Sequence, residues 1–92
     1  MIYLISYDIA DDGRRADVAA LLSAHGPRVQ LSVFECDLAT KAEVEQLVAE
    51  LEQLIEPVED QVRLYPLAAP ALRDRRILGS RTLEERRDFW IL

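Results

Sequence analysis

The stretch MIYLISYDI, residues 1–9, decides how this chain folds. It is apolar, rich in β-branched and aromatic side chains, and shows little alternation of polar with apolar residues. This pattern predicts a central β-strand buried on both faces. The strand ends before Asp11-Asp12-Gly13, a turn sequence that also offers an N-cap for a following helix.

The segments after this turn predict a helix and then extended structure. The helix should run to about Ala24, with an apolar stripe formed by Val18, Leu21 and Leu22. Gly26-Pro27 should end it, because glycine can adopt a left-handed cap and proline cannot continue a helix. Residues 28–38 (RVQLSVFECDL) are strand-like, as one bent strand or as two short strands that meet near Ser32-Val33.

The clearest element is a second helix. Thr40-Lys41-Ala42-Glu43 has the spacing of a capping box. The apolar residues behind it trace one helical face: Val44, Leu47, Val48, Leu51, Leu54 and Ile55. Pro57 should end this helix. Residues 61–67 (QVRLYPL) predict a strand that carries Pro66 at a sheet edge, residues 68–72 a loop, and residues 76–79 a further short strand.

The order β-α-β(β)-α-β predicts a fold of the α+β class. Right-handed crossovers place both helices on the same face of an antiparallel sheet, which is the ferredoxin-like βαββαβ sandwich. We expect residues 1–79 to form this domain, and residues 80–92 to form a charged tail. The other sheet face has no helix to cover it and little polar alternation, so a second copy of the chain is its simplest cover. The sequence therefore predicts a homodimer.

Composition limits the classes of function. A chain of 92 residues with one cysteine suits a single domain without a disulfide framework. We expect a cytoplasmic protein without a membrane span, because no secretion signal or long apolar run is present. The net charge of −6 opposes nucleic-acid binding through the overall field. The arginines nevertheless cluster, either as phosphate contacts or as solvated partners of adjacent acids: Arg14, Arg15 and Arg28, then Arg73, Arg75, Arg76, Arg81, Arg86 and Arg87.

Asp8 is the candidate catalytic residue. The chain has no glycine-rich phosphate loop, zinc-ligand spacing or Ser/His/Asp set. Asp8 ends an apolar strand, where it lines a site or supports the turn that follows. One carboxylate makes a poor magnesium site, but two copies of Asp8 that face each other across a dimer axis could hold Mg²⁺ beside a nucleic-acid phosphate.

Further side chains could bind the nucleic acid. Arg14, Arg15 and Arg28 could neutralise its phosphates. Tyr7 or Phe34 could stack on a base, although aromatic rings in a small fold more often belong to the core.

These residues together resemble a known family. The similarity runs from residue 1 to about residue 79, and the matching motifs are Tyr7-Asp8-Ile9, Asp11-Asp12 with Arg14-Arg15, Gly26 with Arg28-Val29-Gln30, Ser32-Val33-Phe34-Glu35, Asp60-Gln61-Val62-Arg63-Leu64-Tyr65-Pro66-Leu67 and Ile77-Leu78-Gly79. The pattern is similar to that of the Cas-two family, the small CRISPR-associated proteins that accompany the spacer integrase. The resemblance implies a ferredoxin-like homodimer, a magnesium-dependent endoribonuclease or deoxyribonuclease, and a role in acquiring spacers.

The resemblance also implies roles for single residues. Asp8 matches the metal-binding acid of the family. Four residues fall where the family places side chains linked to nuclease activity: Tyr7, Arg15, Arg28 and Phe34. Arg14 joins the nucleic-acid-binding set from its charge and position alone. The apolar end of the tail is expected to contact the dimer partner or the integrase: Phe89, Trp90, Ile91 and Leu92.

Two functions of different class follow. In the first, the protein is a metal-dependent endonuclease that uses Asp8 from both chains. In the second, it is a structural DNA-binding adaptor of the spacer-integration complex, without physiological nuclease activity. A small-molecule regulatory domain on the same fold is a third, less favoured reading.

Overall fold

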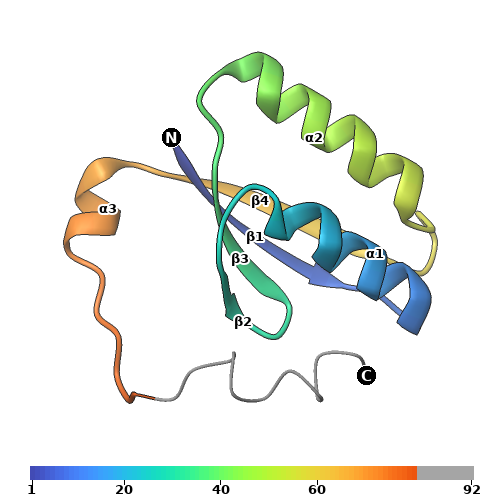
Figure 1. Ribbon diagram of the computed structural model, residues 1–92, viewed down its shortest axis with the longest axis horizontal. Helices are drawn as coiled ribbons and strands as arrows, with labels where there is room; N and C mark the ends of the chain where they lie inside the picture. Colours follow the sequence, from blue (N-terminus) through green and yellow to red (C-terminus); the bar gives the residue numbers. More distant parts are fainter. Residues whose placement is uncertain (81–92) are drawn as a thin grey trace.

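The two long helices cover one face of a four-stranded antiparallel sheet (Figure 1). A computed structural model describes residues 1–80. In chain order the elements are β1 (Ile2–Asp8), α1 (Asp12–Ser23), β2 (Arg28–Gln30), β3 (Val33–Asp37), α2 (Lys41–Leu54), β4 (Gln61–Leu67) and α3 (Ala69–Arg73). The predicted α+β class and ferredoxin-like order are confirmed. Residues 89–92, for which we predicted partner docking, lie outside the described part of the chain.

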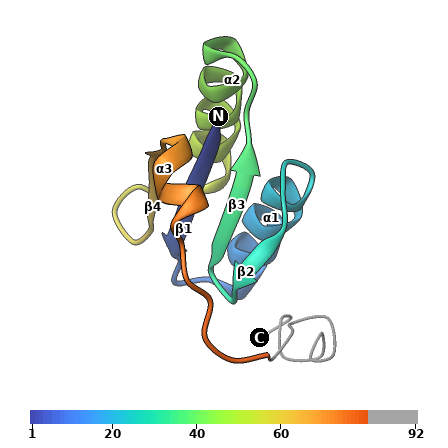
Figure 2. The ribbon, with the colours of Figure 1, turned by 90° about the vertical axis from the view of Figure 1, so that its left-hand side faces the viewer.

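The first strand is central, as its sequence predicts. The sheet order is β2-β3-β1-β4, and β1 pairs antiparallel with β3 and with β4. Figure 2 shows β1 beside β3, with α3 in front of β4. Alternation along β1 directs Ile5 and Tyr7 toward α1 and α2, where both are buried. Ile2, Leu4 and Ser6 are only half-buried, so burial on both faces is wrong for the single chain.

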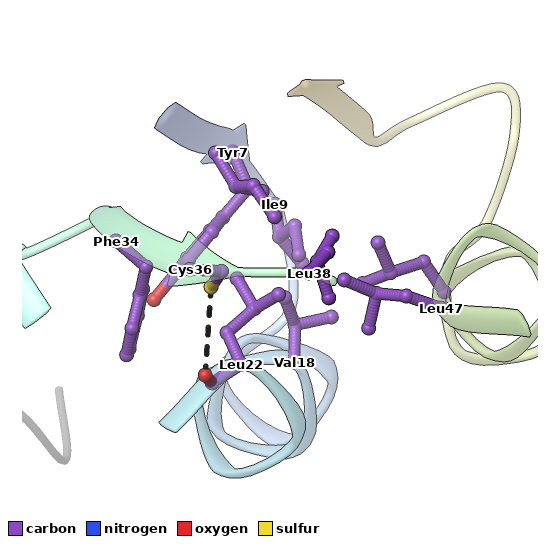
Figure 3. Packing of buried hydrophobic residues seen from close by; sticks show 10 residues of the cluster. Tyr7, Ile9, Val18, Leu22, Phe34, Cys36, Leu38 and Leu47 are labelled. Atoms are coloured by element: carbon purple, nitrogen blue, oxygen red, sulfur yellow. Dashed lines mark hydrogen bonds between the residues drawn. The ribbon is translucent and has the colours of Figure 1, made fainter. Parts of the chain in front are cut away.

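The core lies between the helices and the sheet. Its buried residues come from β1 and the turn after it, β3 and the turn after it, and both long helices: Ile5, Tyr7, Ile9, Val18, Leu22, Phe34, Cys36, Leu38, Leu47 and Leu51. Figure 3 shows several of these side chains packed against one another. Among residues 1–80, no helix is long and apolar enough to cross a membrane.

Side-chain caps begin both long helices. Asp11 accepts a hydrogen bond from the backbone N–H of Arg14 at 2.9 Å and so caps α1. The Thr40 hydroxyl accepts the N–H of Glu43 at 3.1 Å and caps α2. The return bond of the predicted box is displaced by one residue, because the Glu43 carboxylate accepts the N–H of Ala39 instead of that of Thr40.

Gly26 is required for close packing and not for a left-handed cap. Gly79 is the only residue with positive φ in the described part of the chain, so the predicted conformation of Gly26 is wrong. A Cβ atom at Gly26 would lie 1.9 Å from the carbonyl oxygen of Glu35. The chain on either side is bonded to β3, since Asp37 donates its N–H to His25 and Glu35 donates its N–H to Pro27. Only glycine permits this approach.

Three further predictions are settled by backbone pairing. Residues 28–38 form two strands, β2 and β3, with an irregularity between Arg28 and Gln30. The loop predicted over residues 68–72 is wrong, because the short helix α3 occupies it and has proline in its first turn, where no N–H is needed. Residues 76–79 form no strand, since they have no neighbouring strand to pair with in the single chain. Ile77 and Leu78 are consequently 78% and 93% exposed.

Candidate functional site at the end of strand β1

Asp8 lies on the open face of the sheet. It is the last residue of β1, is exposed, and pairs across the ladder with Gln61 at the start of β4. Because side chains alternate along a strand, Asp8 shares its face with Ser6, Leu4 and Ile2, away from α1 and α2. Within residues 1–80 its carboxylate accepts no hydrogen bond and forms no ion pair. Its oxygens are therefore available to an external ligand.

The rest of this open face is largely apolar. The half-buried Leu4 and Ile2 of β1 lie opposite Tyr65 and Leu67 of β4. Tyr65 is 43% exposed. Asp8 thus lies at one end of a surface on which apolar side chains occupy the other end.

Tyr7 and Phe34 lie on the opposite face, inside the core. Their exposed fractions are 6% and 1%, and their ring centroids are 6.4 Å apart. The Tyr7 hydroxyl donates to the carbonyl oxygen of Leu31 at 3.2 Å. Base stacking needs an exposed ring face, which neither ring offers. In this structure both rings pack in the core (Figure 3). The alternation of side chains along β1 places Tyr7 on the face opposite Asp8.

Arg28 is half-buried and contacts both of these rings. Its Nη2 donates to the Tyr7 hydroxyl at 3.1 Å, and its guanidinium carbon lies 5.2 Å from the centre of the Phe34 ring. The charge of Arg28 therefore lies over an aromatic face, which is a cation–π arrangement. Of the four residues that the resemblance groups together, the structure brings Tyr7, Arg28 and Phe34 into contact, whereas Arg15 bonds to Ile9 and Asp12. The thickness of the sheet separates the three residues in contact from Asp8.

Arg14 and Arg15 make contacts within the chain. Arg14 donates its Nε to Asp60 Oδ2 at 2.7 Å, and its Nη2 to Asp60 Oδ1 and to Glu59 Oε2 at 3.2 Å each. Arg15 donates its Nη1 to the carbonyl oxygen of Ile9 at 2.7 Å and also forms an ion pair with Asp12. Both arginines, which we predicted as phosphate ligands, therefore bind groups of their own chain. Their partners are acidic side chains and the backbone carbonyl next to Asp8.

Asp60 is the residue that sequence reasoning missed. Its side chain has no exposed surface, and it accepts backbone N–H groups from Ala10 at 3.0 Å and from Glu56 at 2.8 Å. The hydrogen bond from Arg14 lowers the pKa of this carboxyl far below its usual range, and the two backbone bonds lower it further against the opposing effect of burial. Two signals in the sequence point to it. Asp60 begins the matching motif of residues 60–67, and it lies between the Pro57 turn and a strand, a position where carboxylates often bond to nearby backbone.

A metal site would require ligands beyond one chain. No group of three or more His, Cys, Asp or Glu side chains in residues 1–80 could hold a metal ion. A single exposed carboxylate without an internal partner nevertheless suits Mg²⁺, which is often held by one or two carboxylates together with waters and substrate phosphates. The donor chemistry of Asp8 therefore fits the ion, provided that a second copy or the substrate supplies the other oxygens.

Comparisons with known proteins agree on one family. Residues 1–75 match the family model described as CRISPR associated protein Cas2. The chain is 44% identical over 78 residues to a "CRISPR-associated endoribonuclease Cas2 3" of Synechocystis sp., covering 85% of this chain and 84% of that protein. It is 40% identical over 91 residues to a "CRISPR-associated endonuclease Cas2 2" of Thermus thermophilus, covering 99% and 96%.

Solved structures show the same similarity. The crystal structure of Streptococcus pyogenes Cas2 at pH 6.5 has a TM-score of 0.77 and 36% identity, and the match covers 86% of this chain and all of that one (100%). A chain of a partial Cas6-RT-Cas1–Cas2 complex has a TM-score of 0.74 and 34% identity, with 84% and 83% covered.

Proposed function

Because the chain belongs to the CRISPR associated protein Cas2 family, we propose that it works in CRISPR adaptation as a metal-dependent endonuclease that hydrolyses phosphodiester bonds. The names of its relatives support nuclease activity. The observation that carries the proposal is the exposed carboxylate of Asp8, which ends a central strand and has no partner within residues 1–80. Asp8 is the proposed catalytic residue and metal ligand.

The proposed active unit is a homodimer formed through the open sheet face. Leu4, Ile2, Tyr65 and Leu67 supply an apolar surface on that face, and Asp8 lies at its end. A two-fold axis through the face would bring two copies of Asp8 together, so that each chain contributes one carboxylate. Two facing carboxylates repel each other unless a cation or a proton lies between them. The dimer therefore supports Mg²⁺ as the cofactor.

In this dimer the residues on the two faces of β1 would have separate roles. The two Asp8 carboxylates would hold the metal and orient it toward a phosphate of RNA or DNA. A Mg²⁺ ion bound there would polarise the phosphoryl group and lower the pKa of a bound water. The Tyr7, Arg28 and Phe34 cluster supports the same strand from the opposite face.

A structural adaptor is the second candidate function. It is favoured by the single carboxylate at the site, because residues 1–80 contain no cluster of acids of the kind that many nucleases use. The likeness to a chain in a Cas1–Cas2 complex supports the spacer integrase as a partner. In this role the dimer would hold duplex DNA between integrase subunits, and the partner would carry out the chemistry.

One substitution separates the two functions. Asp8→Asn should abolish Mg²⁺-dependent cleavage of RNA or DNA while the dimer persists in sedimentation. Asp17→Asn is the matched control, because it makes the same change at an exposed position of α1. Undiminished cleavage by Asp8→Asn contradicts the nuclease proposal. Integration with the partner, measured on the same variant, should survive if the protein acts as an adaptor.

A further inference from the structure

Both residues that follow Asp8 are held by side chains from elsewhere in the chain. The carbonyl oxygen of Ile9 accepts Nη1 of Arg15 at 2.7 Å. The N–H of Ala10 donates to Oδ1 of Asp60 at 3.0 Å, across 50 positions of sequence. These bonds fix the backbone at the point where it leaves β1, immediately after the proposed metal ligand.

Asp60 is fixed in turn from two further directions. Arg14 donates a hydrogen bond to each of its carboxylate oxygens, from Nε at 2.7 Å and from Nη2 at 3.2 Å. The N–H of Glu56, beyond the end of α2, donates to Oδ2 at 2.8 Å. Asp60 also directly precedes Gln61, which is the ladder partner of Asp8. One buried carboxylate thus joins the ends of β1 and α2 to the start of β4.

We propose that Arg14, Arg15 and Asp60 are positioning residues that hold the backbone around Asp8, and that Arg14 does not act as a phosphate ligand. The inference rests on the proposed role of Asp8, and it assigns Arg14 and Arg15 a role other than nucleic-acid binding. Metal and phosphoryl chemistry tolerates only small displacements of a ligand, so a loosened loop after β1 should reduce turnover.

The burial of the partners argues against a phosphate contact for Arg14. The Asp60 side chain is fully buried, whereas that of Arg14 is 28% exposed. If Arg14 turned outward to a phosphate, Asp60 would be left as a buried charge without its cation, which is strongly unfavourable. The arginine fork already matches two carboxylate oxygens, and this geometry is one that lysine cannot reproduce.

Lysine substitution separates the two roles of Arg14. Arg14→Lys keeps the charge that a phosphate needs but loses the two-bond fork. For a positioning residue, Arg14→Lys should lower kcat about as much as Arg14→Gln does, roughly tenfold to a hundredfold. Its affinity for labelled RNA and the salt dependence of that affinity should stay unchanged. For a phosphate ligand, Arg14→Lys should act as wild type, and Arg14→Gln should lower the salt slope by about one.

Amide exchange gives a readout that needs no catalysis. In Arg14→Gln, hydrogen exchange at the Ala10 amide, measured by NMR, should accelerate more than exchange in the middle of α2. Broadening of the Asp8 amide by Mn²⁺ should need about tenfold to a hundredfold more ion. Glu59→Gln is the matched control, since it removes only the exposed ion pair between Arg14 and Glu59. Unchanged Ala10 exchange in folded Arg14→Gln overturns the proposal, as does a reduced salt slope.

The role of Arg14 can still be tested if Arg14→Gln does not fold or if the protein does not cleave nucleic acid. If Arg14→Gln does not fold, the double variant Arg14→Gln/Asp60→Asn removes both charges and keeps an oxygen that can accept the Ala10 N–H. If wild type and Asp8→Asn cleave equally, the nuclease proposal fails, but Ala10 exchange and the salt slope still decide the role of Arg14.

Discussion

Tyr7 and Asp8 are consecutive in β1, and their side chains lie on opposite faces of the sheet. The Tyr7 ring is 6% exposed and donates its hydroxyl to Leu31, whereas Asp8 is exposed at the end of the strand. The two-residue period of a strand imposes this division. Residues that neighbour each other in a motif therefore belong to different physical environments, one to the core and the other to the site.

Tyr7→Phe should reduce stability and leave nucleic-acid affinity unchanged. The change removes a hydroxyl that donates to Leu31 and accepts from Arg28, at a cost of about 1 kcal/mol in the free energy of unfolding. Urea denaturation measures this loss, and titration of labelled RNA measures the affinity. A variant that keeps its stability but binds RNA more weakly would show that the phenol contacts the ligand.

Phe34→Ala should be among the most damaging single substitutions in the core. The ring is 1% exposed and packs against Tyr7 and Arg28, so its removal should cost about 3–5 kcal/mol. Val58→Ala, at a side chain that is 91% exposed in the turn before β4, is the control and should change stability by no more than about 0.5 kcal/mol. Similar urea midpoints for the two variants would contradict the core assignment of Phe34.

Gly26→Ala should destabilise the fold by overpacking. The new methyl group would lie 1.9 Å from the Glu35 carbonyl oxygen, and separating the α1 end from β3 should cost about 1–3 kcal/mol. The control is Gly13→Ala, where the methyl meets only the Asp11 side chain at 3.2 Å and the effect should stay within about 1 kcal/mol. Thermal unfolding compares them, and equal melting temperatures would refute a close contact at Gly26.

Acid should weaken the fold through Asp60. The Arg14 hydrogen bond holds the pKa of this carboxyl well below its value in the unfolded chain, which is about 3.9. The unfolded state therefore binds the proton first, so the contribution of Asp60 is complete above about pH 5 and declines as the pH falls below about 4. Urea midpoints at pH 7, 5 and 3 measure this decline. Arg14→Gln/Asp60→Asn should show a shallower decline, and an identical slope would exclude Asp60 as a cause.

Cys36 should react with thiol reagents only after unfolding. Its side chain is fully buried, and burial raises the pKa of the thiol to about 11. At pH 8 iodoacetamide should therefore alkylate Cys36 slowly in the native protein. In urea the alkylation rate should rise to that of an exposed cysteine. Because the folded pKa is raised, the contribution of the neutral thiol to stability is present below about pH 8.5 and falls as the pH rises further. Fast modification of native protein would contradict this burial.

The elements that local sequence determined are those whose stabilising contacts lie within a few residues. The caps at Asp11 and Thr40, the apolar face of α2 and the apolar run of β1 all depend on spacings inside one segment, and each was predicted from the sequence. The position of Asp8 at a strand end followed from the same pattern. These signals predicted the order β-α-β(β)-α-β, with residues 28–38 open as one bent strand or two. The right-handed crossover rule then placed both helices on one face.

Tertiary structure alone decided which partner each polar or small residue meets. Asp60 and Arg14 are 46 positions apart, and Gly26 is required because the fold brings the Glu35 carbonyl against it. The side-chain period of β1 separates Tyr7 from Asp8, but only the packing of α1 and α2 decides which of them is buried. Such pairings depend on chain segments that meet only after folding, and one sequence contains no local signal for them.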